Sequence, residues 1–406
     1  MLSPVTQPAR LKANGRAFAH IAQFHPELTA LRRDLHAHPE LGFEEVYTSA
    51  RVCEALRAAG VDEVHEGVGR TGVVGVIHGQ GRSSGSMIGL RADMDALPMT
   101  EHNDFAWKSA KSGLMHGCGH DGHTTMLVGA ARYLAATRQF DGTAVLIFQP
   151  AEEGMGGARV MIEDGLFRRF PCDRLFALHN LPGEPEGQIL VKPGPITAAV
   201  DIATIVIRGV GGHGAIPHKA VDPVVAAASL VMALQTIVSR NLDPHDPAVI
   251  TVGAINGGSM ATVIPEEVKL FVGLRTVTAP VRQMALTRIR DLAVAHAKSF
   301  GCTAEVDTGA GSVSYPAGFN AAEEAALVRE VALEMGQDPA KVDMRGPFMF
   351  SEDFSSMQEI VPSCYFGLGA GPGPMLHDPG YDFNDALLVT GPAFWARLVE
   401  KALPQA

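Results

Sequence analysis

Two patterns of apolar residues alternate along the first half of the chain. Short apolar runs bounded by Gly or Pro, which are typical of buried strands, alternate with segments whose apolar residues recur at helical spacing. The alternation predicts an α/β domain with a mostly parallel sheet, in which reactive side chains gather at the carboxyl ends of the strands. The clearest strand-like runs are residues 73–77, 87–90, 144–148 and 175–178, and the clearest helical segments are 28–35 and 123–137.

The pattern changes at residues 192–195, where the sequence reads KPGP. From residue 201 to residue 307 the predicted order is strand, helix, strand, strand, helix, strand. That βαββαβ order is the ferredoxin-like one, which usually carries an antiparallel sheet. The sequence therefore predicts a second, smaller domain.

After about residue 311 the α/β pattern returns, with an apolar strand at 364–368 and a C-terminal helix containing Trp395. The smaller domain is therefore expected to be an insertion in the larger one. The predicted boundaries are 1–195 and 312–406 for a catalytic metal-binding α/β domain, and 196–311 for the inserted domain.

Composition narrows the class of protein. Apolar residues make up 46% of the 406 residues, which is typical of a packed globular chain, and the formal net charge of -11 argues against a nucleic-acid partner. The five cysteines are scattered and never form CxxC, which predicts reduced thiols in the cytoplasm. The longest nearly apolar run, 224–234, is shorter than a bilayer span, so no membrane partner is expected.

One motif is misleading. Residues 67–72 match the GxGxxG pattern, but a dinucleotide-binding loop lies between a strand and a helix, and a strand-like run follows this one. The glycines are better explained by a turn.

The densest group of candidate ligands is HGCGHDGH, residues 116–123. In an extended stretch side chains two apart point the same way, so Cys118 and His120 could chelate one ion. A thiolate with an imidazole suits Zn, Co, Ni or Mn better than Ca or Mg. The alternative is a buried cysteine in a glycine turn with solvated histidines.

Three further candidate positions follow predicted strands or lie near the C-terminus. The pair Glu152 and Glu153 follows the run 144–148, and one carboxylate could bind metal while the other acts as a general base. Spacing does not say which does which, and a solvated acidic pair opening a helix is the alternative. His179 follows the next strand, and His377 lies near the C-terminus.

Eight segments in unbroken order resemble the metal-dependent amidohydrolases related to hippurate hydrolase, N-acyl-amino-acid amidohydrolases and auxin-conjugate hydrolases, within the aminoacylase and carboxypeptidase G family. The segments are RRDLHAHPELGFEE (32–45), LRADMDALPM (90–99), HGCGHDGH (116–123), QPAEEG (149–154), ALHNLPG (177–183), GVGGHGAIPHKAVDP (209–223), FSEDF (350–354) and LHDPGYDFND (376–385). The resemblance covers the chain from about His25 to its end.

The resemblance implies a catalytic α/β domain that holds two divalent metal ions. Ligation by thiolate, imidazole and carboxylate admits Zn, Mn, Co or Ni, and we expect Zn or Mn first. It implies an inserted lid domain that commonly also dimerises, so a homodimer or higher homo-oligomer is expected. Carried over motif by motif, the implied metal ligands are Cys118, His120, Glu153, His179 and His377.

The same resemblance assigns supporting roles. Glu152 is implied to be the general base. His213 is implied to meet the substrate carbonyl or oxyanion, either within one subunit or across a dimer interface. Asp95 and Asp121 are implied to orient the ligating imidazoles. His116 and His123 are expected to be structural.

Substrate contacts are expected in the inserted domain. Arg275 resembles the arginine that relatives place near the substrate carboxylate, although a solvated strand arginine is the alternative. His218 and Asn256 are further candidates for substrate binding. Relatives usually carry Asn where this chain has Thr262, which places one polar substrate contact in doubt.

The expected reaction is hydrolysis of the amide bond of N-acyl amino acids such as hippurate, with a metal-bridged water as nucleophile. A dipeptidase or carboxypeptidase with the same site is the nearest alternative. A non-catalytic small-molecule binder is the third hypothesis, although every implied ligand and the base are present.

Overall fold

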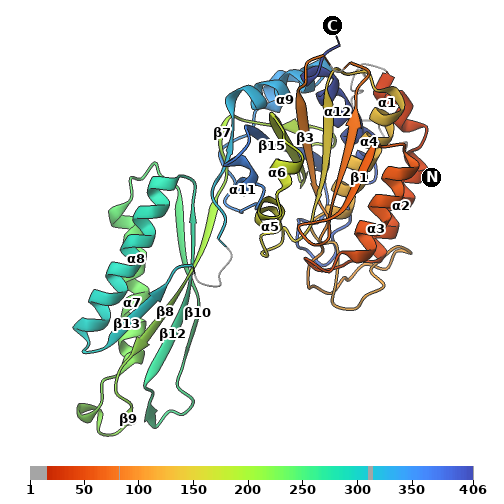
Figure 1. Cartoon of the computed structure of the whole chain (residues 1–406). Coiled ribbons are helices and arrows are strands. Elements are labelled where there is room, and N and C mark those ends of the chain that lie inside the picture. The colour runs from red at the N-terminus through yellow and green to blue at the C-terminus, as the bar shows by residue number, and fades with distance from the viewer. Residues whose placement is uncertain (1–15, 82, 310–313, 406) are drawn as a thin grey trace, which may run out of the picture. The chain divides into compact units, whose positions relative to one another are not determined.

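The computed structural model describes residues 16–81, 83–309 and 314–405, and it divides into two compact units (Figure 1). The first unit contains the described residues up to Gly194, together with Phe319–Arg345 and those from Ser356 onward. The second contains the described residues of Pro195–Gly318 and Gly346–Ser355. Residues 1–15, the start of the segment before His25, lie outside the described residues.

A seven-stranded sheet forms the centre of the first unit, in the order β1-β2-β4-β3-β5-β15-β6. Its strands are β1 (Glu63–Val68), β2 (Gly72–His78), β3 (Met87–Asp93), β4 (Thr143–Gln149), β5 (Arg174–Pro182), β6 (Ile189–Leu190) and β15 (Ser363–Gly371). β3 runs parallel to β4 and β5, and β5 runs parallel to β15, whereas β1, β2 and β6 pair antiparallel. The sheet is therefore mixed, and the prediction of a mostly parallel sheet is wrong at its edges.

The antiparallel edge begins with a hairpin at the GxGxxG segment. β1 and β2 pair directly across it, with Val68 opposite Gly72. Gly67, Gly69 and Arg70 all have φ between 65° and 78°, and such left-handed backbone is what a tight turn requires. The prediction of a turn rather than a dinucleotide loop agrees with this geometry, and the hairpin is why β1 runs antiparallel to β2.

Helices cover both faces of this sheet (Figure 1). α2, α3, α4 and α12 pack on one face, and α5 lies against β4 on the other. The helices of this unit and its boundary are α1 (Arg16–Ala22), α2 (His25–Ala37), α3 (Val46–Ala58), α4 (His120–Thr137), α5 (Gly157–Glu163), α6 (Leu166–Arg169), α9 (Ala322–Glu334), α10 (Pro339–Val342), α11 (Ser355–Gln358) and α12 (Leu387–Ala402).

The second unit has the strand and helix order βαββαβ. Its four-stranded sheet has the order β10-β12-β8-β13, and every pair is antiparallel. These elements are β8 (Ala199–Arg208), α7 (Pro223–Thr236), β10 (Ala248–Gly257), β12 (Glu267–Thr276), α8 (Ala279–Ser299) and β13 (Thr303–Asp307). The shorter elements are β7 (Gly194–Thr197), β9 (Gly212–His213), η1 (Pro217–Lys219), η2 (Ile237–Asn241), β11 (Val263–Ile264) and β14 (Gly318–Asn320).

The two faces of this second sheet differ in burial. Ile205 and Leu270 are fully buried in a core that also contains Leu230 of α7 and Ile289 of α8. The alternate residues point away from that core, and Phe271 among them is 38% exposed. Side chains alternate between the faces of a strand, so helices cover one face of the sheet only.

The helical segment Pro223–Asn241 is the most apolar helix of the described chain. It has 19 residues, and by length and composition alone it could cross a membrane. A core helix passes the same test, and Leu230 and Leu234 of this helix pack in the core of the second unit.

We predict that the core of the first unit depends on Phe366. Its ring lies 5.1 Å from that of Phe394 and 5.3 Å from that of Trp395, between β15 and α12, and it is fully buried. Phe366→Ala should lower the free energy of unfolding by about 3–5 kcal/mol, because it removes buried contacts and leaves a cavity. Urea denaturation measures this.

Phe319→Ala is the matched control for Phe366→Ala, because Phe319 is 58% exposed. The control should change the free energy of unfolding by less than about 0.5 kcal/mol. Equal losses in the two variants would contradict the assignment of Phe366 to the core.

Candidate metal centre

Three parallel strands bring candidate ligands to one edge of the central sheet. Asp93 at the end of β3 pairs with Gln149 at the end of β4, and Arg91 pairs with Ala177 in β5. The segments that leave these strands carry Asp95 and Glu153, and His179 lies in β5 near its carboxyl end. Parallel strands end at the same edge, so residues far apart in the sequence converge there.

Cys118 and His120 reach this edge from the start of α4. The expectation that both lie in an extended stretch is wrong, because His120 is the first residue of the helix. Gly119 has φ 94°, and a Cβ atom there would lie 2.4 Å from Oδ1 of Asn180. Only glycine fits this turn, which brings the two side chains together at the helix N-terminus.

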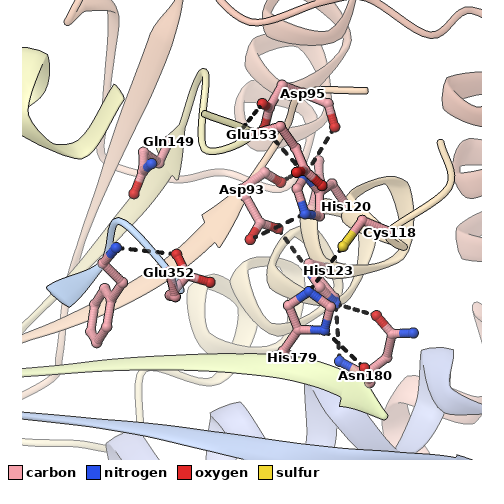
Figure 2. Close-up of polar contacts among 12 residues, drawn as sticks. Asp93, Asp95, Cys118, His120, His123, Gln149, Glu153, His179, Asn180 and Glu352 are labelled. Carbon is pink, nitrogen blue, oxygen red and sulfur yellow. Dashed lines mark hydrogen bonds and ion pairs between the residues drawn. The ribbon is translucent and has the colours of Figure 1, made fainter. Parts of the chain in front are cut away.

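All six residues predicted as ligands or base lie together (Figure 2 labels four of them). Sγ of Cys118 lies 3.3 Å from Nε2 of His179. Three sets of residues each have ligand atoms within 4.8 Å of one another: Cys118 with His120 and His179, Cys118 with Glu153 and His377, and His120 with Glu152 and Glu153. All of them belong to the first unit.

Backbone carbonyls determine which imidazole nitrogens are free to bind metal. Nδ1 of His179 donates to the carbonyl oxygen of Asn180 at 2.8 Å, and Nδ1 of His120 donates to that of Asp95 at 2.9 Å. A carbonyl only accepts, so each Nδ1 carries a proton. In a neutral imidazole Nε2 then keeps a lone pair, which is the arrangement of metal-ligating histidines.

Burial and charge favour a cation at this position. Burial, together with Glu153, raises the pKa of the Cys118 thiol well above its usual value. Burial, together with His123, lowers the pKa of His179 well below its usual value, so its imidazole is neutral. For His120 burial lowers the pKa, but Asp93 and Cys118 outweigh it and raise the pKa well above the usual value. A thiolate here needs a positive partner.

Two buried atoms that could bind a metal ion also lack hydrogen bonds. Nε2 of His120 and Oε1 of Glu153 have no hydrogen-bond partner among the described residues, although buried polar atoms normally have one. Nε2 of His377 approaches Oε1 of Glu153 to 3.2 Å, but the contact does not have the geometry of a hydrogen bond. A thiolate, neutral imidazoles and carboxylates suit borderline divalent ions. The residues present therefore fit a metal site.

Asp95 contacts two parts of the site at once. Its Oδ1 lies 3.2 Å from Nδ1 of His120, and its Oδ2 accepts the backbone N–H of Glu153 at 2.8 Å. This geometry is suitable for the orienting role expected for Asp95. Asp121 has other partners: its Oδ2 contacts Nδ1 of His36 at 2.8 Å, and its backbone carbonyl accepts the hydroxyl of Thr125 at 2.7 Å.

The other histidines of the HGCGHDGH segment are buried. Nδ1 of His123 contacts Asp93 at 2.6 Å and Nε2 contacts Asn180 at 2.6 Å, so both nitrogens already have partners. His116 is also buried, and burial lowers its pKa to about 3. Both positions suit the structural roles expected for them.

The sequence interpretation missed the residues that support this site. Asp93 joins His123 to Arg91, and Asn180 donates to the hydroxyl of Tyr381 at 2.6 Å. The sequence did contain a signal for two of them, Arg91 and Asp93. Arg91 and Asp93 are charged residues two apart near the end of an apolar strand, where burial requires that they be paired.

The predicted substrate-binding residues lie in the second unit. His213 is the last residue of β9 and is exposed, and its Nδ1 accepts the backbone N–H of Ala215 at 3.1 Å. His218 lies in η1 and Asn256 in β10, both exposed. Thr262 is exposed as well.

Arg275 in β12 differs from these exposed residues. It is partly buried, its guanidinium donates to the hydroxyl of Ser351, and burial lowers its pKa. In the part of the chain that the structure describes, Arg275 forms no ion pair with a carboxylate, and burial is the cause of its lowered pKa.

Comparison with known proteins places the chain in a family. Residues 89–401 match the profile of peptidase family M20/M25/M40. The chain belongs to this family. It is 40% identical over 378 residues to hippurate hydrolase of Campylobacter jejuni, covering 93% of this chain and 97% of that protein. It is also 37% identical over 343 residues to thermostable carboxypeptidase 1 of Saccharolobus solfataricus, covering 84% of each.

A solved member of the M20 family has the same fold. The protein from Bacillus subtilis described as a dinuclear metal binding peptidase from the M20 family is 31% identical, with a TM-score of 0.81, covering 95% of this chain and all of that one. The chain is therefore an amidohydrolase of the M20 family with a mixed α/β fold, and the predicted family resemblance is confirmed. The hypothesis of a non-catalytic binder is not supported.

We predict that Cys118 is required for metal retention by this M20 enzyme. Cys118→Ala removes a thiolate ligand and should lower the molar ratio of bound metal to protein, measured by plasma mass spectrometry after desalting. Cys172→Ala is the matched control, because Cys172 lies outside the cluster and contacts the carbonyl of Phe170. Full metal occupancy in Cys118→Ala would contradict the assignment of Cys118 as a metal ligand.

A buried ionic network joins α2 to residues next to the candidate metal ligands. Nδ1 of His36 contacts Asp121 at 2.8 Å and Nε2 contacts Glu101 at 3.3 Å. Burial lowers the pKa of His36, but the bonds to Asp121 and Glu101 outweigh it and raise the pKa to about 9. Nearby, Arg32 bonds Asp385 and holds the segment that follows His377.

The raised pKa of His36 predicts a pH dependence of stability. Between the unfolded value of about 6.5 and the folded value of about 9, the folded state holds a proton that the unfolded state lacks. The stabilisation from His36 is therefore complete below about pH 6.5 and is lost as the pH rises through 9. Urea denaturation of the wild type and of His36→Gln across this range should show a difference in unfolding free energy that shrinks with pH.

The control for His36→Gln is His38→Gln, since the His38 side chain is 42% exposed at the end of the same helix. If the difference in unfolding free energy between the wild type and His36→Gln stays constant from pH 6 to pH 10, His36 does not hold the extra proton of the folded state.

Proposed function

We propose that the chain hydrolyses the amide bond of N-acyl amino acids such as hippurate, releasing a carboxylic acid and a free amino acid. Two divalent ions, Zn or Mn in preference to Co or Ni, would be held by Cys118, His120, Glu153, His179 and His377. The observation that carries the proposal is the convergence of this donor set at the strand ends, where Nδ1 of His120 and of His179 is bonded to a backbone carbonyl, so that Nε2 is the nitrogen that each ring can present to a metal ion. The similarity to a hippurate hydrolase supports the substrate class.

The proposed mechanism assigns proton transfer to Glu152. Bound divalent ions would supply Lewis acidity, which lowers the pKa of water and polarises the amide carbonyl. Glu152 accepts a proton from the attacking water as the new C–O bond forms, and returns it to the leaving nitrogen as the C–N bond breaks. Its side chain is buried and has a carboxylate oxygen within 4.8 Å of ligand atoms of His120 and Glu153.

Residues 196–311, in the second unit, are proposed to form an inserted ferredoxin-like domain that acts as a lid. The same domain is proposed to contribute to a homodimer or higher homo-oligomer. The βαββαβ order and the antiparallel sheet support the ferredoxin-like assignment. His213 is proposed to meet the substrate oxyanion. We place the enzyme in the cytoplasm, in agreement with its five free cysteines.

Arg275 is proposed to bind the free carboxylate of the substrate. A partly buried guanidinium without a carboxylate partner among the described residues can form a two-bond clamp with an incoming carboxylate. His218 and Asn256 are proposed to contact substrate nearby, and Thr262 to provide a hydroxyl where relatives have an amide.

A dipeptidase or carboxypeptidase activity is the second candidate. The similarity to a thermostable carboxypeptidase favours it, because the same site cleaves either bond depending on the group on the acyl side. The two activities differ in whether that group is a simple acid or an amino acid.

We predict that the substrate panel separates these two candidates. Protein stripped of metal and reloaded with Zn, Mn, Co or Ni should release amino acids from benzoyl- and acetyl-amino acids faster than from dipeptides. Amine release with a fluorogenic reagent measures both series. Higher kcat/KM for dipeptides with every metal would make the peptidase candidate correct.

We predict that Glu152→Gln retains its metal and loses turnover. Removing a general base should lower kcat by about 10²–10⁴-fold, while the amide keeps the size of the side chain. Activity is measured at metal loading confirmed by mass spectrometry. Glu163→Gln is the control, since Glu163 lies at the end of α5, outside the cluster. Near wild-type turnover in Glu152→Gln would refute the assignment.

A further inference from the structure

A buried carboxylate contacts the turn that carries Glu152, although no role has been assigned to it. Glu45 precedes α3 and is completely buried. Its Oε1 accepts the backbone N–H of Ala151 at 2.8 Å, and its Oε2 accepts the hydroxyl of Thr71 at 2.5 Å. Glu45 thus reaches the residue immediately before the proposed base, from a segment more than a hundred residues away.

The backbone at Ala151 needs such a contact. Ala151 has φ 55°, in the left-handed region that residues with a Cβ atom rarely adopt. That conformation costs about 1–2 kcal/mol in a residue other than glycine and persists only where surrounding contacts impose it. Ala151 is also fully buried, so its N–H has no access to water and depends on Glu45 for an acceptor.

Neighbouring contacts confine the same turn. A Cβ atom at Gly42 would lie 2.9 Å from Cα of Ala151, so the chain just before Glu45 packs directly against the turn. The carbonyl of Ala151 accepts the N–H of Gly157 at 3.0 Å. At Gly157 a Cβ atom would lie 1.7 Å from the carbonyl oxygen of Pro150. The turn therefore closes tightly on itself.

A second carboxylate holds the other side of Glu152. Oδ2 of Asp95 accepts the backbone N–H of Glu153 at 2.8 Å. The N–H groups of the residues before and after Glu152 are therefore each bound by a buried carboxylate, from Glu45 and from Asp95. This arrangement restrains the backbone of Glu152 from both directions.

We propose that Glu45 is a positioning residue for the general base, holding the Ala151 N–H so that the carboxylate of Glu152 is directed into the metal centre. The proposal rests on the proposed function, in which Glu152 moves the proton. Burial raises the pKa of Glu45 to about 7. In either protonation state Oε1 can accept from Ala151, because the Thr71 hydroxyl can donate or accept.

The test compares Glu45→Ala with Glu45→Gln. Glu45→Ala removes the acceptor, and kcat should fall by about 10- to 100-fold with KM within about threefold, as expected for a catalytic group displaced by a fraction of an ångström. Glu45→Gln keeps a carbonyl oxygen for Ala151 and an amide for Thr71, so kcat should stay within about threefold of the wild type. The matched control is Glu44→Ala, because Glu44 is the exposed neighbour.

A readout without substrate separates this proposal from the proposed function. Amide hydrogen exchange of the peptide spanning residues 148–157 should show faster exchange in Glu45→Ala than in the wild type, Glu45→Gln or Glu44→Ala. If the wild type cleaves no substrate of the panel, the proposed function fails, while the exchange result still decides whether Glu45 holds the turn.

Several outcomes would overturn the proposal. Folded, metal-loaded Glu45→Ala with wild-type kcat would do so, as would unchanged exchange in the turn. Loss of kcat in Glu45→Gln equal to that in Glu45→Ala would assign the effect to charge. Loss of bound metal in Glu45→Ala would assign the fall in kcat to a displaced metal ligand, Glu153, and not to Glu152.

Discussion

The main constraint on this structure is that ionisable side chains are buried where β3, β4 and β5 end together. Cys118, His120 and His179 are buried and have ligand atoms within 4.8 Å of one another, and the partly buried Glu153 lies equally close to Cys118. Such a group of donors is costly to bury unless a positive charge compensates it. The rest of the first unit follows from that requirement: a wide sheet supports the strand ends, and carboxylates and carbonyls behind the donors hold them in place.

Much of the fold could be predicted because buried strands have a simple signature. The central strands β3, β4 and β5 are covered on both faces by helices, so they appear in the sequence as continuous apolar runs. β1 could not be recognised this way, since it reads EVHEGV and lies at the edge of the sheet, where one of its six residues is buried. Strand direction also depends on connections, and the hairpin at Gly67–Gly72 makes β1 antiparallel to β2.

The candidate site was predictable where chemistry is local and unpredictable where it depends on distant contacts. Cys, His and Glu in short motifs could be identified by residue type, and the family resemblance ordered Glu152 and Glu153. By contrast, Glu45 meets Ala151 only after two segments 106 residues apart have folded together. The partner of Asp121 was missed for the same reason, because His36 reaches it from a helix 85 residues earlier in the chain.

The use of main-chain carbonyls to hold Nδ1 of His120 and His179 bears on how this centre tolerates mutation. A carboxylate that fixes an imidazole can be lost by a single codon change, whereas the carbonyl of residue 95 or residue 180 exists whatever side chain is encoded there. The choice of ligating nitrogen is thus inherited with the path of the backbone. Side chains around the centre can diverge, and with them substrate preference, while the nitrogen presented by each imidazole stays the same.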